Sequence, residues 1–184
     1  MLLILPITAY AQQADPALQE PTNAATVFPP IALTGRIVDE AELISPKVER
    51  RLTSALALLE RRVGPQFVIV TVNSLDGMPI EEYGQRLGNC WGIGSADRDD
   101  GLILLVAPNE RKVRIEVGLG LEAVVTDEYA ADVVKTRILP PFSRGEMELG
   151  IRQGADTLIR KLMDMRDQIY AQPPADRQGL TCNG

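Results

Sequence analysis

Four carboxylates in the second half of the chain have the types and spacing to bind a hard metal ion. Asp99 and Asp100 precede an apolar run, Glu116 lies in the segment after that run, and Asp127 follows shortly afterwards. Glycines stand beside these residues and leave backbone carbonyl groups accessible. Ca²⁺ accepts many such oxygen ligands in irregular geometry, whereas Mg²⁺ retains more of its water. The pattern favours a divalent-cation site, with Ca²⁺ preferred and Mg²⁺ as the alternative ion.

The same four residues also fit ordinary structural roles. Asp100-Gly101 is a common turn signal, and Asp127 can lie in the first turn of a helix and favour its dipole. Glu116 can face solvent from a strand. Both interpretations stay open on the sequence alone.

The chain contains no histidine. A Ser-His-Asp triad, a Cys-His pair and a histidine-ligated zinc ion are therefore excluded. No catalytic residue can be assigned, because any chemistry would have to come from carboxylates, Lys, Arg, hydroxyl groups, the backbone or a hard metal ion.

Hydrophobic periodicity predicts the elements that position these carboxylates. A β-branched run and a second apolar run are typical of buried parallel strands, and the segment after them alternates as in a one-sided hairpin strand. These elements predict an α/β/α sandwich, in which a small mixed sheet is covered by helices on both faces. We expect helices over 46–63, 79–91, 127–138 and 146–165, the last two separated by Pro140-Pro141, and strands over 67–72, 102–107 and 113–117.

The hairpin gathers the carboxylates at one edge of the predicted sheet. A turn centred near Glu110 would place Leu104 opposite Glu116 and Asp100 opposite Gly120. The helix over 79–91 runs antiparallel to the strands, so the loop after it reaches the same edge. The next helix begins close by, at Asp127.

Two further motifs invite a ligand interpretation. Gly118-Leu-Gly120-Leu-Glu-Ala123 fits a dinucleotide fingerprint, but that site needs a parallel strand after its helix, and none is predicted. We therefore expect no nucleotide cofactor, and expect these glycines to permit positive φ or a bulge. Glu110, Arg111, Lys112 and Arg114 could form a phosphate-binding patch, but a charged hairpin tip is usually a solvated turn, and we favour that interpretation.

The ends of the chain differ in composition from its centre. Residues 1–11 are apolar and end in Ala9-Tyr10-Ala11, a signal-peptide cleavage pattern, which predicts a periplasmic or secreted protein. We expect a flexible leader over 12–32, one domain over 33–165 and a polar tail over 166–184. Cys90 and Cys182 could pair in an oxidising compartment.

The net charge of −6 argues against nucleic acid and against anionic lipid as partners. It is compatible with cations or basic partners. We expect a monomer.

Several motifs occur in the order and spacing of a known family. They are Gly35-Arg-Ile-Val-Asp39-Glu-Ala-Glu-Leu-Ile-Ser45, Trp91-Gly-Ile-Gly94, Asp99-Asp-Gly101-Leu-Ile-Leu-Leu-Val106, Arg114-Ile-Glu116-Val-Gly118-Leu-Gly120-Leu-Glu122 and Thr126-Asp127. Over about residues 33–163 the chain resembles the TPM domain, a family of the thylakoid lumen, of bacterial envelopes and of a membrane protein associated with acetylcholine receptors.

The resemblance implies an α/β/α sandwich, binding of divalent cations by acidic residues, chiefly Ca²⁺, and the weak acid-phosphatase activity attributed to the thylakoid branch. It adds Asp39 to the acidic candidates Asp99, Asp100, Glu116 and Asp127. Asp39 can join them only if segment 33–44 doubles back, because the helix from 46 begins at the opposite edge.

Three functions follow as hypotheses. The first is an exported domain that binds Ca²⁺ or a related cation and assists a membrane or envelope protein complex. The second is a weak, metal-assisted phosphomonoesterase, and the third is a structural adaptor without metal. Ligands of open α/β sheets usually bind at the carboxyl ends of the strands, near Asn73 and Asn109, which is the edge opposite to the carboxylates. The two indications disagree, and we follow the family motif.

Overall fold

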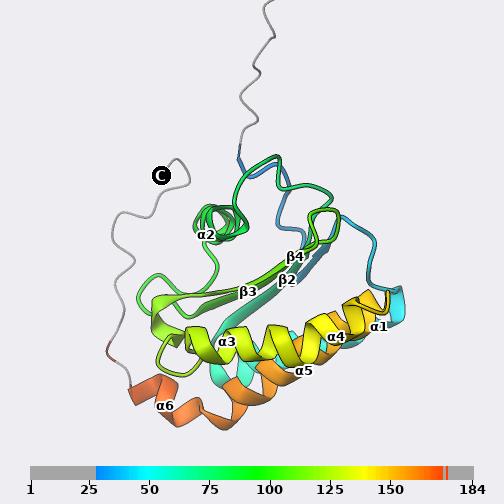
Figure 1. The fold of residues 1–184 in the computed structure, drawn as a ribbon. Helices are drawn as coiled ribbons and strands as arrows, with labels where there is room; N and C mark the ends of the chain where they lie inside the picture. The colour runs from blue at the N-terminus through cyan, green and yellow to red at the C-terminus, as the bar shows by residue number, and fades with distance from the viewer. Residues whose placement is uncertain (1–27, 172, 174–184) are drawn as a thin grey trace, which may run out of the picture.

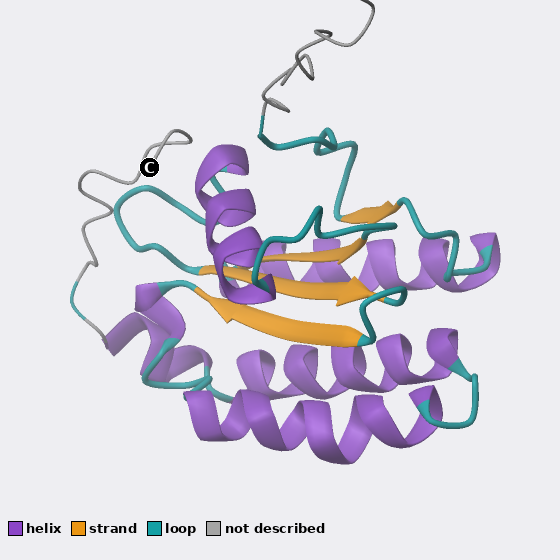
Figure 2. Cartoon of the chain, turned by 45° about the horizontal axis from the view of Figure 1, so that its top comes forward, coloured by secondary structure: helices purple, strands orange, loops and turns teal. Residues whose placement is uncertain are grey.

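The computed structural model describes residues 28–171 and residue 173. The chain forms an α/β/α sandwich, with a four-stranded sheet in the order β1-β2-β3-β4 between two helical layers (Figure 1). Helix α2 covers one face, and α1, α3, α4 and α5 cover the other, as Figure 2 also shows. The elements are β1 (Ile37–Asp39), α1 (Pro46–Val63), β2 (Gln66–Thr71), α2 (Ile80–Trp91), β3 (Gly101–Ala107), β4 (Lys112–Val117), the short 3₁₀ helix η1 (Leu119–Leu121), α3 (Asp127–Val133), the π-helical turn η2 (Val134–Ile138), α4 (Leu139–Phe142), α5 (Met147–Asp164) and α6 (Arg166–Ala171).

The pairing of the three predicted strands is confirmed, but the hairpin register is shifted by one residue. Strands β2 and β3 are parallel, and β4 returns antiparallel to β3. Glu116 lies opposite Ile103, not opposite Leu104 as predicted. Because successive strand residues point to opposite faces, this shift moves Glu116 from the α1–α5 face to the α2 face.

A fourth strand, β1, was not predicted. It pairs parallel with β2 and places Asp39 opposite Thr71. Three residues are too few to show an alternating pattern, so the sequence gives no strand signal here. The strand forms because the flanking segment lies along the open edge of β2.

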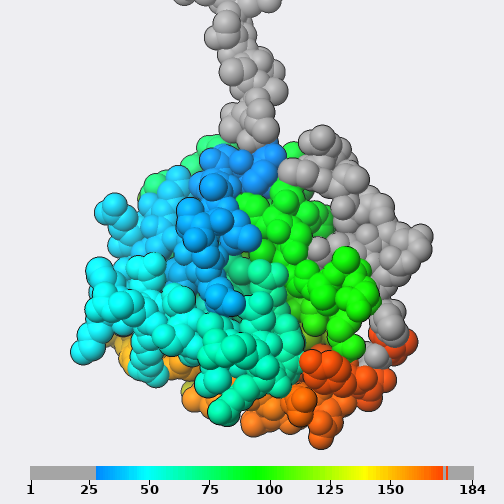
Figure 3. Space-filling view, turned by 180° about the vertical axis from the view of Figure 1, so that it is seen from behind, coloured from blue at the N-terminus to red at the C-terminus, as the bar shows by residue number. Residues whose placement is uncertain are grey.

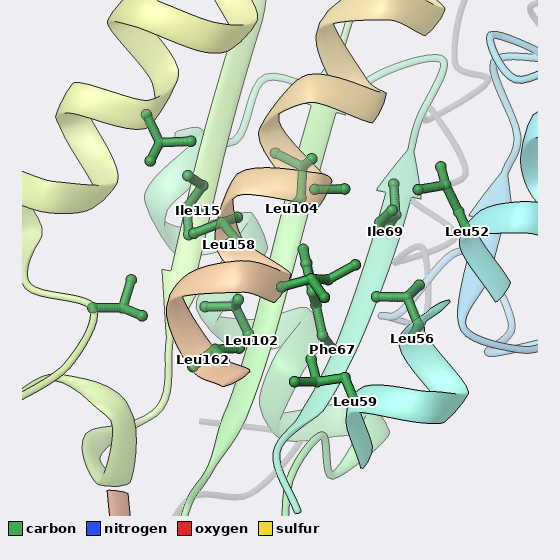
Figure 4. Packing of buried hydrophobic residues seen from close by; sticks show 14 of the residues in the cluster. Leu52, Leu56, Leu59, Phe67, Ile69, Leu102, Leu104, Ile115, Leu158 and Leu162 are labelled. Atoms are coloured by element: carbon green, nitrogen blue, oxygen red, sulfur yellow. The ribbon is translucent and has the colours of Figure 1, made fainter. Parts of the chain in front are cut away.

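The sheet has a hydrophobic core on each face. On the larger one, α1 contributes Leu52, Leu56 and Leu59, and these pack toward Phe67 of β2 and Leu104 of β3 (Figure 4). The smaller core lies under α2 and includes Tyr83 and Leu87. Both faces of the central strands are thus buried, as the continuous apolar runs in the sequence predict.

Helix boundaries follow local signals where these are strong. Helix α1 begins at Pro46 and ends before Gly64, whose φ of 104° disfavours other residues.

We expected the pair Pro140-Pro141 to separate two helices, but it lies inside α4. Proline is tolerated in a first helical turn, where backbone N–H groups have no partner. The break comes later, between α4 and α5.

The domain extends beyond the expected limits of 33 and 165. Phe28 and Ile31, placed in the leader, pack against the core under α2. Residues 166–171, placed in the tail, form α6, and Ile169 is buried. Figure 3 shows the first described residues, in blue, lying on the body of the domain. The predicted signal peptide, most of the leader and Cys182 lie outside the described residues.

None of the helices in the described part of the chain has the length and apolar character that a membrane span requires.

Candidate functional site

A cavity of about 260 Å³ lies between the second half of α2, the start of β3 and the end of β4. We call it the acidic pocket, because it contains three carboxylates and, among the described residues, no Lys or Arg in its lining. It is lined by Gln85, Gly88, Asn89, Ile93, Asp99, Gly101, Ile103, Glu116, Val117, Gly118, Leu119 and Glu122.

Asp99 enters the pocket from the loop between α2 and β3. Its backbone has a φ of 48°, and its N–H donates to the carbonyl oxygen of Ser95 at 2.8 Å. Its carboxylate oxygen Oδ2 accepts the backbone N–H of Leu119 at 3.0 Å. Asp99 therefore ties the loop to η1 while its buried carboxylate lines the cavity.

Asp100, the neighbouring candidate, holds the loop and does not line the pocket. Its Oδ1 accepts the backbone N–H and the hydroxyl of Ser95, both at 2.8 Å. Its Oδ2 lies 3.7 Å from Nε of Arg98. With both oxygens engaged and the side chain buried, Asp100 is a structural residue of the loop.

Glu116 reaches the pocket from the edge strand β4. Its Oε2 accepts a hydrogen bond from Nε of Arg114 at 2.6 Å. Burial nevertheless raises the pKa of Glu116 above its ordinary value, and the negative charges of Asp127 and Glu81 act in the same direction. A cation beside this carboxylate would offset the cost of keeping it ionised there.

The pocket exists because glycines allow backbone segments to approach closely. A Cβ on Gly118 would lie 2.1 Å from the carbonyl oxygen of Asp99, and one on Gly120 would lie 1.9 Å from that of Arg98. Neither glycine has positive φ, so our expectation of positive φ there was wrong. Their role is to bring η1 against the loop before β3.

Three polar lining residues were missed at the sequence level: Gln85, Asn89 and Glu122. Gln85 and Asn89 lie one turn apart on α2, and Gly84 and Gly88, which each precede one of them, let this helix approach the sheet. A Cβ on Gly84 would lie 3.4 Å from Oε2 of Glu116. The paired glycines of α2 were a signal for this close approach, but no spacing rule placed Glu122.

Asp39 and Asp127 do not line the pocket. Asp39 lies at the opposite end of the strands, where its Oδ2 accepts the N–H of Ile44 at 2.8 Å and its Oδ1 the hydroxyl of Thr71 at 2.6 Å. Segment 33–44 does not double back.

Asp127 is exposed in the first turn of α3, where its negative charge interacts favourably with the helix dipole, and Thr126 caps that helix. Its charge is felt by Glu116, but it remains outside the cavity.

The five predicted ligands are thus distributed over separate places, and only Asp99 and Glu116 share the pocket. Within the described chain, no three side chains of Asp, Glu, Cys or His converge as a preformed metal centre. The lining offers carboxylate and amide oxygens, which are the ligand atoms that a hard cation such as Ca²⁺ prefers. It does not offer a complete coordination shell, so an ion bound here would retain water.

Comparison with known proteins agrees with this architecture. The sequence model of the TPM domain matches residues 37–161. No curated protein matches the chain significantly.

Three solved structures from bacteria are similar to the chain. The N-terminal domain of a protein from P. gingivalis has 28% identity and a TM-score of 0.68, covering 73% of this chain and 85% of that domain. The N-terminal domain of the cg2496 protein from Corynebacterium glutamicum has 19% identity and a TM-score of 0.55, covering 70% and 80%. The BA42 protein from Bizionia argentinensis has 14% identity and a TM-score of 0.52, covering 76% and 90%. The last two likenesses show the fold alone.

Proposed function

Since the chain belongs to the TPM domain family, we propose that it is an exported envelope domain that binds a divalent cation, preferably Ca²⁺, in the acidic pocket and so assists a membrane or envelope protein complex. The observation that carries the proposal is the pocket lining. Asp99, Glu116 and Glu122 face one small cavity, and no cationic side chain among the described residues lines it.

The electrostatics of the pocket support a positively charged ligand. Burial raises the pKa of Glu116, and the nearby charges of Asp127 and Glu81 raise it further, so keeping this lining carboxylate ionised is costly. Arg114 offsets only part of this cost from the edge of the strand. A cation would offset more of it and would gain oxygen ligands from side chains of α2, of the loop before β3 and of β4, and from Glu122 after η1.

Affinity for Ca²⁺ should be weak, because the structure contains no preformed coordination shell. We expect a Kd on the order of 10⁻⁴–10⁻³ M, the range of extracellular Ca²⁺ modules. Such affinity suits a compartment in which the ion is abundant. It would let the ion stabilise the pocket-forming loop when a partner is to be bound there.

The alternative of a metal-assisted phosphomonoesterase has less support. A phosphate ester carries negative charge, and the lining of the acidic pocket would repel it unless an ion lay between them. Arg98 is engaged with Asp100 and with the carbonyl oxygen of Ile169, so it is not aimed at a substrate. Hydrolysis of an aryl phosphate should therefore be well below the common kcat range of roughly 1–10³ s⁻¹. Fast turnover that is lost with chelator and in Asp99→Asn would make the protein an enzyme.

Thermal unfolding of the metal-free protein with added Ca²⁺ tests the proposal. For a Kd of about 1 mM, Ca²⁺ at ten times that concentration should stabilise the fold by about 1.4 kcal/mol. This corresponds to a rise in Tm of about 3–6 °C for a domain of this size. Mg²⁺ at the same concentration should have a smaller effect, and K⁺ at matched ionic strength measures simple screening.

Two variants and one control assign the effect to the pocket. Asp99→Asn and Glu116→Gln each remove one charge from the lining and should abolish most of the Ca²⁺ response. Asp132→Asn removes the same charge from an exposed position on α3 and should respond like the parent. Equal responses in all four proteins would show that Ca²⁺ acts elsewhere, and no response in the parent would favour the metal-free adaptor.

Export is the remaining part of the proposal. It rests on the apolar residues 1–11 and their Ala9-Tyr10-Ala11 ending. Protein isolated from its native host should begin at or near Gln12, whereas a cytoplasmic protein that retains Met1 would contradict export.

A further inference from the structure

A second, larger cavity lies at the other end of the strands. Its volume is about 550 Å³, and it lies between the tip of the β3–β4 hairpin and the segment from α4 to the start of α5. We call it the hairpin cavity. It is lined by Ala107, Pro108, Arg111, Lys112, Val113, Leu139, Phe142, Ser143 and Met147.

The walls of the hairpin cavity are mostly apolar. Val113 comes from the hairpin, Leu139 and Phe142 from α4, and Met147 from α5. Leu139 is 43% exposed although it is a large hydrophobic residue. Volume and lining both match small-molecule sites, which measure roughly 300–1,000 Å³ and combine apolar walls with a few polar groups.

The exposure of Leu139 has a local cause in the sequence. Pro140 and Pro141 have no backbone N–H and cannot continue the regular helical hydrogen bonds. The chain forms the π-helical turn η2 just before them, and the N–H of Leu139 donates to the carbonyl oxygen of Val134. π-helical turns are frequent at functional sites. Here the turn leads directly into the residues that wall the cavity.

The charged residues of the lining are both positive. Arg111 and Lys112 form no ion pair with any described residue. Their neighbour Glu110 is turned toward the loop after β2, where its Oε1 accepts the N–H of Leu75 at 2.9 Å. This hydrogen bond and the charge of Lys112 both lower the pKa of Glu110, so Glu110 offsets part of the positive charge. Arg144, next to Ser143, is paired with Glu146 and adds no net charge. On a chain with a net charge of −6, this is a locally positive and apolar site.

From the cavity, its apolar walls and its two cations, we propose that the hairpin cavity binds a small amphiphilic anion, with its carboxylate or phosphate head at Arg111 and Lys112 and its apolar chain along Leu139, Phe142 and Met147. Arginine and lysine are the usual partners of such heads. The site lies at the carboxyl end of β3, where ligands of open α/β sheets bind. It is independent of the acidic pocket, which lies at the opposite end of the same strands.

The test is a titration of the full chain followed by backbone amide chemical shifts. The probes are decanoate and decyl phosphate below their aggregation concentrations, and their relative affinities identify the preferred head. Binding of either probe should shift the amides of Lys112, Val113 and Met147. Decanol lacks the charge and acetate lacks the chain, so each should bind at least about fivefold more weakly, which is the effect of roughly 1 kcal/mol.

Three variants locate the site. Lys112→Gln and Leu139→Ser change exposed positions and should each weaken binding by about fivefold or more without a change in Tm. Arg111→Asn should do the same, because asparagine tolerates the positive φ of 54° at this position. Arg62→Gln, in the last turn of α1 at the opposite end of the sheet, is the charge-matched control and should bind like the parent.

The proposal is overturned if neither probe binds the parent. It is also overturned if Lys112→Gln, Leu139→Ser and Arg62→Gln bind the probes equally well, because the anions would then not be held in the hairpin cavity.

Discussion

The carboxylates at the acidic end of the sheet divide into those that hold the backbone and those that line a cavity. Asp100 accepts two hydrogen bonds from Ser95, whereas Asp99 and Glu116 line the pocket. Adjacent residues with the same side chain can thus have different functions. The difference lies in which donors reach them.

Asp100→Asn should lower stability without changing the response to Ca²⁺. The substitution weakens charge-assisted hydrogen bonds of a buried group, which costs about 1–3 kcal/mol. Urea unfolding with and without Ca²⁺ measures both quantities. A loss of the Ca²⁺ response at unchanged stability would mean that Asp100, not Asp99, binds the ion.

The raised pKa of Glu116 predicts how Ca²⁺ binding depends on pH. Protons and Ca²⁺ compete for this carboxylate, so the Ca²⁺-induced rise in Tm should decrease as the pH falls through a value above the ordinary 4.5. Without Ca²⁺ the sign is opposite. The folded state favours the protonated form, so stability from this group is present below the ordinary pKa and is lost as the pH rises through the raised one.

Glu116→Gln separates these two effects. It should abolish most of the Ca²⁺ response and also remove the loss of metal-free stability with rising pH. The measurement is a series of melting curves from acidic to neutral pH. A Ca²⁺ response that keeps the same pH dependence in this variant would assign the titration to another carboxylate.

At the scale of elements, the acidic pocket depends on close contact between η1 and the loop before β3. Gly94, Gly101, Gly118 and Gly120 have almost no room for a Cβ, and in each case the obstacle is backbone. The glycine-containing segment after β4 therefore allows close packing of the backbone. The loop cannot shift without opening the pocket.

Gly118→Ala should destabilise the fold by about 1–3 kcal/mol, the usual cost of overpacking. Its Cβ would meet the carbonyl oxygen of Asp99, which must then move. The matched control is Gly35→Ala, where the nearest atom is 4.0 Å away and little change is expected. Denaturant unfolding compares the two, and equal stabilities would show that the loop yields easily.

At the scale of the whole molecule, the last described helix supports the acidic end of the domain. Nη2 of Arg98 donates to the carbonyl oxygen of Ile169 at 2.8 Å, and the guanidinium lies 4.6 Å from the ring centroid of Tyr170. Figure 3 shows α6, in orange-red, against the bright green loop that follows α2. A segment assigned to the tail thus helps to position Asp99 and Asp100.

Ile169→Ala should cost about 2 kcal/mol, the lower end for a buried isoleucine, because a terminal helix can relax. Amide hydrogens in the loop 95–100 should then exchange faster, because a loosened α6 holds the backbone carbonyl that Arg98 binds less firmly. Gln168→Ala, at an exposed position on the same helix, is the control. Unchanged exchange in the loop would mean that α6 does not support the site.

The sequence by itself determined the layers of this protein. Long apolar runs, Pro46 and Gly64 around α1, and the alternation in β4 are local signals, and the elements that they predict are confirmed. The absence of histidine also excluded whole classes of chemistry, because composition needs no geometry.

Only the tertiary structure decided which carboxylates share a site. The hairpin register is shifted by one residue from the predicted one. Hydrophobic patterns do not locate a turn to within one residue, yet this shift reverses the face of the sheet on which Glu116 lies. Asp39 is separated from the others because β1 joins the sheet parallel to β2, a pairing that three residues cannot signal. Glu122 and the side-chain amides of Gln85 and Asn89 line the pocket because glycines let backbone segments that are far apart in the sequence approach each other closely. No local sequence pattern predicts such long-range contacts.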